Sequence, residues 1–147
     1  MTDYFRTPED YELFIYTLSE QFVSIRRSTV TFVRRGATLA RVTGELFFDQ
    51  DIRLTVRERL VYSPISLHLD EYGYEVWRGN EKLYWYDSQP HPNNPDLQST
   101  HPHHKHVPPD IKHHRIPAPQ MSFAQPNFSA LINEIEKLIN DLERVFL

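Results

Sequence analysis

The stretch Ile52-Arg53-Leu54-Thr55-Val56-Arg57-Glu58-Arg59-Leu60-Val61 alternates cleanly between apolar and polar side chains. Successive side chains of a β-strand point to opposite faces of its sheet, so this pattern predicts a strand with one buried face. Only Glu58 interrupts the apolar set, and the other face carries Arg53, Arg57 and Arg59. The stretch therefore predicts a sheet that is covered on one side and basic on the other.

Similar strand signals lie on both sides of this stretch, and turn residues such as Arg35-Gly36, Gly73 and Gly79-Asn80 separate them. The additional strands are expected at Ser24–Arg34, Thr38–Phe48, Ile65–Leu69, Tyr74–Arg78 and Lys82–Asp87. Connections this short join antiparallel strands, because a parallel pair needs a long crossover. Residues 24–87 are therefore predicted to form an antiparallel meander of roughly five to six strands.

Amphipathic helices are expected at both ends of this meander. Thr7 as N-cap and Pro8 at the first helical position predict a helix over residues 8–22. Asn127 as N-cap predicts a second helix over residues 127–146. Each helix has an apolar stripe that needs a partner, so both are expected to pack on one face of the sheet. The predicted fold is a single α+β domain over residues 1–147 whose arginine face stays open.

Residues 88–126 form a Pro/His-rich segment between the meander and the second helix. Gln89–Pro126 holds seven of the eight histidines and nine of the eleven prolines in the chain. Proline disfavours helix and cannot donate a strand hydrogen bond, so the segment is predicted to be one long extended loop. Its centre is His101-Pro102-His103-His104-Lys105-His106, and Asp87 at the end of the preceding strand could orient one of these imidazoles.

Three roles compete for this histidine cluster. The first is acid–base cleavage of RNA without a metal, which needs a proton acceptor, a proton donor and cations beside the phosphate. Its catalytic residues would be His101, His103, His104, Lys105, His106 and Asp87, and RNA would contact Arg53, Arg57, Arg59, Tyr84 and Tyr86. The second role is binding of a divalent metal, although the spacing matches no defined zinc motif. The third is non-catalytic, either pinning the loop to the sheet or binding a partner.

Composition excludes several other classes of function. The chain has no cysteine, so it has neither disulfides nor thiolate metal sites, and its four glycines form no phosphate-binding loop. No apolar run reaches the roughly 20 residues of a membrane span, which predicts a soluble, cytoplasmic protein. Five arginines and no acidic residue lie between positions 24 and 41, whereas both ends are acidic, and this asymmetry is typical of a surface that binds polyanions.

The runs Tyr86-Asp87, Pro90-His91 and Ser99-Thr100-His101-Pro102-His103-His104-Lys105-His106, with the meander before them and the helix after them, resemble the TumE family of toxins. The resemblance implies a toxin that is paired with an antitoxin, usually a helix-turn-helix protein, and that acts on RNA or translation. His91 is single where the family pattern often has a pair. The resulting prediction is a metal-independent endoribonuclease toxin, with a histidine-ligated, metal-dependent hydrolase as the alternative and a homodimer as a candidate assembly.

Overall fold

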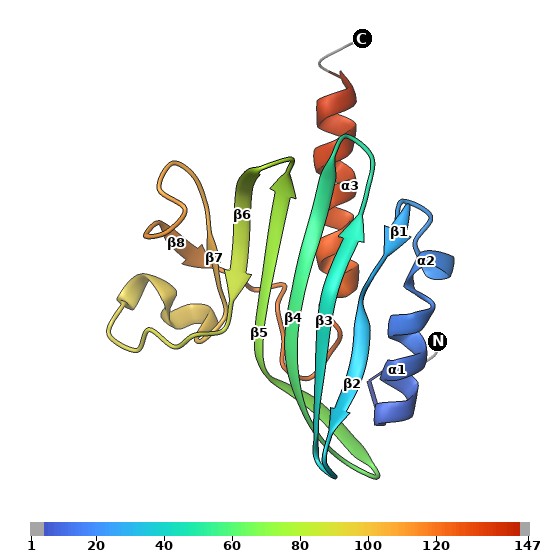
Figure 1. Ribbon diagram of the computed structural model, residues 1–147. Coiled ribbons are helices and arrows are strands. Elements are labelled where there is room, and N and C mark those ends of the chain that lie inside the picture. Colours follow the sequence, from blue (N-terminus) through green and yellow to red (C-terminus); the bar gives the residue numbers. More distant parts are fainter. Residues whose placement is uncertain (1–4, 145–147) are drawn as a thin grey trace.

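The computed structural model describes residues 5–144, and within them one antiparallel sheet of eight strands is backed by helices (Figure 1). The strands are β1 (Arg27–Ser28), β2 (Thr31–Arg35), β3 (Leu39–Phe47), β4 (Ile52–Ser63), β5 (Ser66–Arg78), β6 (Glu81–Asp87), β7 (His104–His106) and β8 (Arg115–Pro117). They lie in the order β1-β3-β4-β5-β6-β7-β8, and β2 also pairs with β3. The predicted α+β class is confirmed, but the sheet has more strands than expected.

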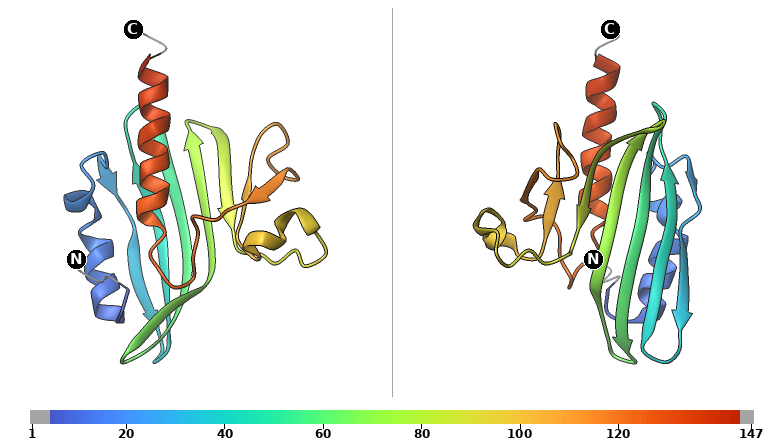
Figure 2. Two further views of the ribbon diagram at one scale, coloured as in Figure 1. Left: turned by 180° about the vertical axis from the view of Figure 1, so that it is seen from behind. Right: turned by 60° about the vertical axis from the view of Figure 1, so that its left-hand side comes forward.

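The central strand β4 forms as its alternation predicts. Ile52, Leu54, Val56 and Leu60 are buried, while Arg53, Arg57 and Arg59 point to the opposite face. The full helices and short helical turns are α1 (Pro8–Tyr16), α2 (Leu18–Gln21), η1 (Pro95–Thr100) and α3 (Phe128–Arg144). Seen from behind, α1 and α3 cover the same side of the sheet (Figure 2). We call this the covered face, and the side with the arginines the open face.

The first predicted helix, over residues 8–22, is interrupted. Thr7 caps α1 by accepting the Asp10 amide at 3.2 Å, as expected, but the chain leaves the helical conformation at Thr17. The Thr17 hydroxyl donates to the Leu13 carbonyl at 2.8 Å, which competes with the regular backbone pattern and separates α1 from α2. The helices α1 and α3 meet in the core, where the rings of Phe14 and Phe128 lie 6.0 Å apart in an edge-to-face contact.

The second predicted helix forms as α3, and residues 145–146 of that prediction lie outside the described part of the chain. Asn127 directly precedes it, but the hydrogen bonds of its buried side chain go to Ser122 and Tyr74. Asn127 therefore ties the helix start to the sheet instead of capping α3. None of the helices within residues 5–144 is long and apolar enough to cross a membrane.

Two predictions for the sheet were wrong. Gly73 does not end a strand, because β5 runs continuously from Ser66 to Arg78 and Gly73 pairs with Arg57 on one side and Asp87 on the other. The segment over residues 88–126 is also not one unpaired loop. Its prolines flank the His104–His106 strand and do not interrupt it, so β7 can pair with β6 and with β8.

Glu58 is the charged residue among the buried side chains of β4, and it lies fully buried on the covered face. Its carboxylate accepts hydrogen bonds from Tyr11 at 2.6 Å and from Tyr74 at 2.5 Å, and Asn127 donates to the Tyr74 hydroxyl at 3.0 Å. Burial raises the pKa of the Glu58 carboxyl to about 7, although both tyrosine hydrogen bonds act in the opposite direction. These bonds explain how β4 tolerates an acid within its apolar face.

Candidate functional site

The pairing of β6 with β7 brings three chemically reactive side chains together. Asp87 lies opposite His104 and Trp85 lies opposite His106, so the carboxylate and both imidazoles share one face of the sheet. Lys105, between the two histidines, points the other way and contacts Glu134 of α3 at 3.0 Å. Asp87, His104 and His106 therefore lie on the open face, and we call this group the histidine centre.

Both imidazoles of the histidine centre are fixed at two ends. Their Nε2 atoms face Asp87, at 2.8 Å from Oδ1 for His104 and 3.6 Å from Oδ2 for His106. Their Nδ1 atoms face backbone carbonyls, at 3.0 Å from Pro102 for His104 and 2.9 Å from Ile111 for His106. A carbonyl oxygen can only accept, so each Nδ1 carries the proton of that hydrogen bond.

The centre is buried but charged. Asp87 is 8% exposed and both histidines are 1% exposed. Burial raises the pKa of the Asp87 carboxyl, but the contacts with His104 and His106 outweigh it and hold this pKa well below its usual range. Asp87 is therefore a carboxylate at neutral pH, with two imidazoles as its neighbours.

Trp85 holds His106 in place, although it is not among the site residues predicted from the sequence. The two rings stack with centroids 3.6 Å apart and planes 9° apart. The Trp85 Nε1 donates at 3.0 Å to the Ile111 carbonyl, the same oxygen that receives the Nδ1 proton of His106. Alternation could have found this residue, because Trp85 precedes Asp87 by two positions and must share its face if both lie in one strand.

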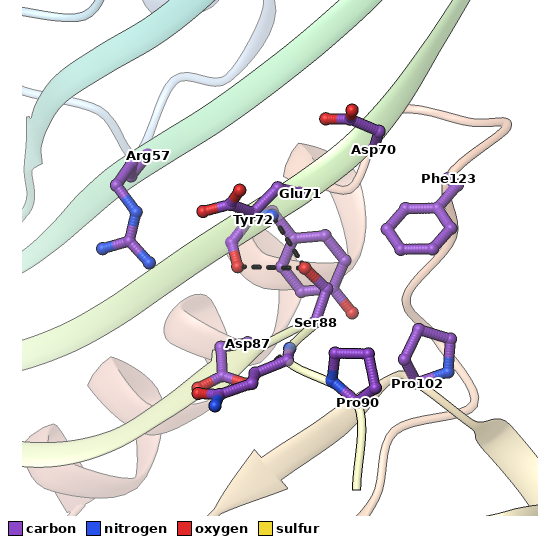
Figure 3. Close-up of a pocket in the computed structure, with 10 residues that line it drawn as sticks. Arg57, Asp70, Glu71, Tyr72, Asp87, Ser88, Pro90, Pro102 and Phe123 are labelled. Carbon is purple, nitrogen blue, oxygen red and sulfur yellow. Dashed lines mark hydrogen bonds between the residues drawn. The ribbon is translucent and has the colours of Figure 1, made fainter. Parts of the chain in front are cut away.

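Two hollows on the open face meet at Asp87. One, of about 480 Å³, lies between Arg57 on one side and Pro102 and Phe123 on the other (Figure 3). The other, of about 420 Å³, is lined by His106, Lys112 and Arg115 among others. We call them the Arg57 hollow and the Arg115 hollow. A bound molecule that fills either one would reach the carboxylate of the centre.

Arg57 belongs to the same row of the sheet as the centre, because Arg57 pairs with Gly73, Gly73 with Asp87, and Asp87 with His104. A Cβ atom on Gly73 would lie only 2.5 Å from a guanidinium nitrogen of Arg57. The guanidinium therefore lies directly over the glycine, on the path towards Asp87. Gly73 matters here because it has no side chain to block that path.

The other predicted catalytic residues lie apart from this centre. The Nδ1 atom of His103 lies 2.6 Å from the Tyr72 hydroxyl, and its ring stacks on the tyrosine. Lys105 is bound to Glu134 on the covered face, and His101 is exposed. Because His103 and His104 are neighbours, the strand directs them to different environments. The predicted cluster is therefore split, and only His104 and His106 join Asp87.

The predicted RNA-binding residues also separate. Tyr84 and Tyr86 lie on the covered face with the Lys105 ammonium 4.4 Å and 5.2 Å from their ring centroids, so they cannot share a ligand with the arginines. Arg53 is bound to Glu45 at 2.9 Å, and Arg59 lies 3.6 Å from Asp70. Among the described residues, Arg57 has no acidic partner within 4.0 Å, so it is the arginine of β4 that is free to meet an anion.

Comparison with known proteins links the chain to one family. A family model described as toxin TumE matches residues 14–139, which include the end of α1, the whole sheet and most of α3. No curated protein and no solved structure matches the chain. The matched range contains every residue of the histidine centre and both hollows beside it.

Proposed function

The chain belongs to the TumE toxin family, and we propose that this toxin of a toxin–antitoxin system cleaves RNA at the histidine centre. The observation that carries the proposal is the position of the centre. A charged carboxylate and two imidazoles meet on the open face, with Arg57 beside one hollow and Arg115 beside the other. A carboxyl whose pKa is strongly shifted, as that of Asp87 is, is typical of functional sites when it lies in a cleft.

Cleavage of RNA by its own 2′-hydroxyl needs three things from a site. A group must accept the hydroxyl proton as the oxygen bonds to phosphorus, and the bond from phosphorus to the 5′-oxygen must break as that oxygen takes a proton from water. Cations must also stabilise the extra negative charge on the phosphate oxygens. The histidine centre offers proton acceptors, and Arg57, Lys112 and Arg115 offer the positive charge.

This proposal is narrower than the sequence prediction. It keeps Asp87, His104 and His106 and leaves out His101, His103 and Lys105, because their side chains lie elsewhere. It also replaces the stripe of three arginines with Arg57 on one side of the centre and Arg115 on the other.

Purified protein tests the proposal directly. We expect the wild-type chain to cut total RNA or tRNA, and His104→Ala and His106→Ala to reduce the rate at least about 100-fold, as expected for loss of a proton-transfer group. His68→Ala is the matched control, because His68 is exposed on β5 outside the centre. Intact RNA after incubation with the wild-type protein, with and without divalent metals, would contradict the proposal. So would growth arrest that survives the two centre substitutions.

Membership of the toxin family implies an antitoxin partner. We propose that this antitoxin is a helix-turn-helix protein encoded beside the toxin and that the pair acts in the cytoplasm, where its RNA substrate is found. The supporting evidence is the resemblance of the Tyr86–His106 region to the family, and the neighbouring gene would test it. Formation of a homodimer stays a prediction, which the molar mass in solution would decide.

A further inference from the structure

We infer that the histidine centre binds one divalent first-row transition-metal ion through the Asp87 carboxylate and the Nε2 atoms of His104 and His106. The site is argued from geometry and hydrogen bonding, and only the use of the ion in catalysis rests on the proposed function. These three ligand atoms all lie within 4.8 Å of one another. Three steps lead from this arrangement to a metal ion.

The first step is the protonation of the two rings. Each Nδ1 atom donates its proton to a backbone carbonyl, at 3.0 Å and 2.9 Å. A neutral imidazole has one N–H group, so each Nε2 atom then presents a lone pair towards Asp87. The carboxylate also presents lone pairs, so in the neutral form of the rings these groups would repel each other at 2.8 Å and 3.6 Å unless a proton or a metal ion lies between them.

The second step concerns what could relieve this repulsion. Both Nε2 atoms are buried, and neither has an aligned hydrogen-bond partner among the described residues, although His104 lies within hydrogen-bonding distance of Oδ1. A proton on His104 alone would serve its 2.8 Å contact but leave the buried Nε2 of His106 without a partner. Protonation of both rings would place two positive charges, with centroids 5.0 Å apart, against one carboxylate in a buried site. A cation between the three atoms satisfies every lone pair without that cost.

The third step is the fit to known metal geometry. A tetrahedral ion with metal–nitrogen distances near 2.0 Å needs ligand atoms about 3.3 Å apart. The Nε2 atoms lie 2.8 Å from Oδ1 and 3.6 Å from Oδ2, and the three ligand atoms lie within 4.8 Å of one another, so rotations of the side chains that bring them closer would complete the site. Three protein ligands leave a fourth position for water or substrate, as in catalytic zinc sites. The Arg115 hollow, which reaches both Asp87 and His106, gives access to that position.

The surroundings of the ligands support the same conclusion. Histidines that bind a metal almost always donate their second ring proton to a carboxylate, a water or a backbone carbonyl, as His104 and His106 do. Trp85 adds a second support, because it stacks on His106 and shares the Ile111 carbonyl with it. Two imidazoles with one carboxylate suit zinc, iron or nickel, whereas magnesium and calcium prefer oxygen ligands. A bound ion would lower the pKa of its water towards 7, and the resulting hydroxide could accept the 2′-hydroxyl proton of RNA.

Metal binding by the full chain tests the inference without any assay of activity. We expect protein stripped with a chelator to bind one Zn²⁺ per chain by calorimetry, and to give a visible absorption spectrum with Co²⁺. His104→Ala and His106→Ala should weaken binding at least about 100-fold, because each removes a ligand. The double variant Asp110→Asn/His113→Ala is the control. It removes an exposed carboxylate–histidine pair with a 3.0 Å contact elsewhere in the same segment, and should bind as the wild type does.

A measurement on the wild-type chain covers the case in which a centre variant does not fold. Nitrogen NMR should show the rings of His104 and His106 protonated at Nδ1, and their Nε2 signals should shift on addition of Zn²⁺, unlike that of His114, whose Nδ1 faces the Pro108 carbonyl outside the centre. Absence of saturable Zn²⁺ and Co²⁺ binding by folded wild-type protein would overturn the inference, and so would full binding by the His104→Ala/His106→Ala double variant.

The metal inference and the proposed function can fail separately. Stoichiometric Zn²⁺ binding by protein that leaves RNA intact would sustain the metal site and refute the ribonuclease. RNA cleavage by folded wild-type protein that binds no ion would sustain the ribonuclease, return proton transfer to the histidines themselves, and overturn the metal site.

Discussion

Glu58 and Asp87 are both buried carboxylates in one sheet, but their charges differ because their neighbours differ. Glu58 lies on the covered face between two tyrosine hydroxyls, which donate hydrogen bonds but carry no charge. Burial therefore dominates there and raises its pKa to about 7. Asp87 lies on the open face between two histidines, and these hold its pKa well below the usual range despite burial. The contacts that each carboxyl makes, together with its depth of burial, decide which of the two stays ionised.

This difference also separates structure from function. The hydrogen-bonded groups around Glu58 come from α1, β5 and the start of α3, so its network joins both helices to the sheet. Asp87 is contacted by neighbouring strand β7 and opens onto two hollows. We therefore expect changes at Glu58 to alter stability and changes at Asp87 to alter ligand binding.

The largest effect is expected from Glu58→Ala. This substitution leaves the hydroxyls of Tyr11 and Tyr74 without their acceptor and opens a cavity, which together should cost about 3–5 kcal/mol of unfolding free energy. Urea denaturation followed by tryptophan fluorescence would measure it. Glu58→Gln is the matched control, because the amide keeps the shape and one acceptor, and it should cost clearly less. Equal losses in the two variants would contradict the role given to the network.

The pH dependence of stability should reveal the raised pKa of Glu58. Its folded pKa of about 7 exceeds its ordinary value of 4.5, so folding favours the protonated form and this contribution is complete below about pH 4.5. As pH rises through 7 the contribution is lost, lowering the unfolding free energy by up to about 3 kcal/mol. The difference in unfolding free energy between wild type and Glu58→Gln, followed from about pH 4 to about pH 8, isolates the contribution of Glu58. A constant difference would show that Glu58 does not titrate in this range.

A smaller but more specific effect is expected from Asp87→Asn. The amide preserves the size of the side chain but removes the charge that the two histidines face. We expect Zn²⁺ affinity to fall at least about 100-fold, since even the loss of a residue that only hydrogen-bonds to a metal ligand costs about 10- to 100-fold. Calorimetry on the stripped protein would measure the change. If Asp87→Asn instead behaved like Glu58→Gln, with altered stability and unaltered Zn²⁺ binding, the contrast between the two carboxylates would fail.

The smallest effect is expected from Gly73→Ala. The added methyl group would lie 2.5 Å from the Arg57 guanidinium, which is the far end of a flexible side chain and can move aside. Stability should therefore change little, whereas RNA cleavage should fall about tenfold because the Arg57 guanidinium is displaced from the centre. In an Arg57→Ala background the same substitution should have no further effect on cleavage. A tenfold loss in that background would place the cause outside Arg57.

Much of the sheet could be predicted because its signals are local. The alternation of Ile52–Val61 specifies both the strand and its buried side, and Gly79-Asn80 forms the turn between β5 and β6 as expected. The strand β7 could not be predicted in this way, because its three residues gain their structure from pairing with β6 across the long connection that contains η1. Composition alone indicated a loop, and the long-range pairing overrides it.

The candidate site was predicted in part for the same reason. Asp87 and the histidine-rich run were identified from residue type, which is a local property. Which histidines meet Asp87 depends on which side chains of the strand point to its face of the sheet. His104 and His106 could therefore be separated from His103 and Lys105 only once β7 was known to pair with β6. Gly73 was interpreted as a turn because its role depends on Arg57 in the neighbouring strand.

The position of the centre beside β8 also bears on how this protein avoids unwanted association. The exposed edge of a sheet can pair with the edge of another molecule and so start aggregation. Here that edge is only three residues long and ends at Pro117, which has no N–H group to donate to an incoming strand. The centre lies one strand inside this short edge. A second chain would therefore gain little by extending the sheet at this edge, next to the centre.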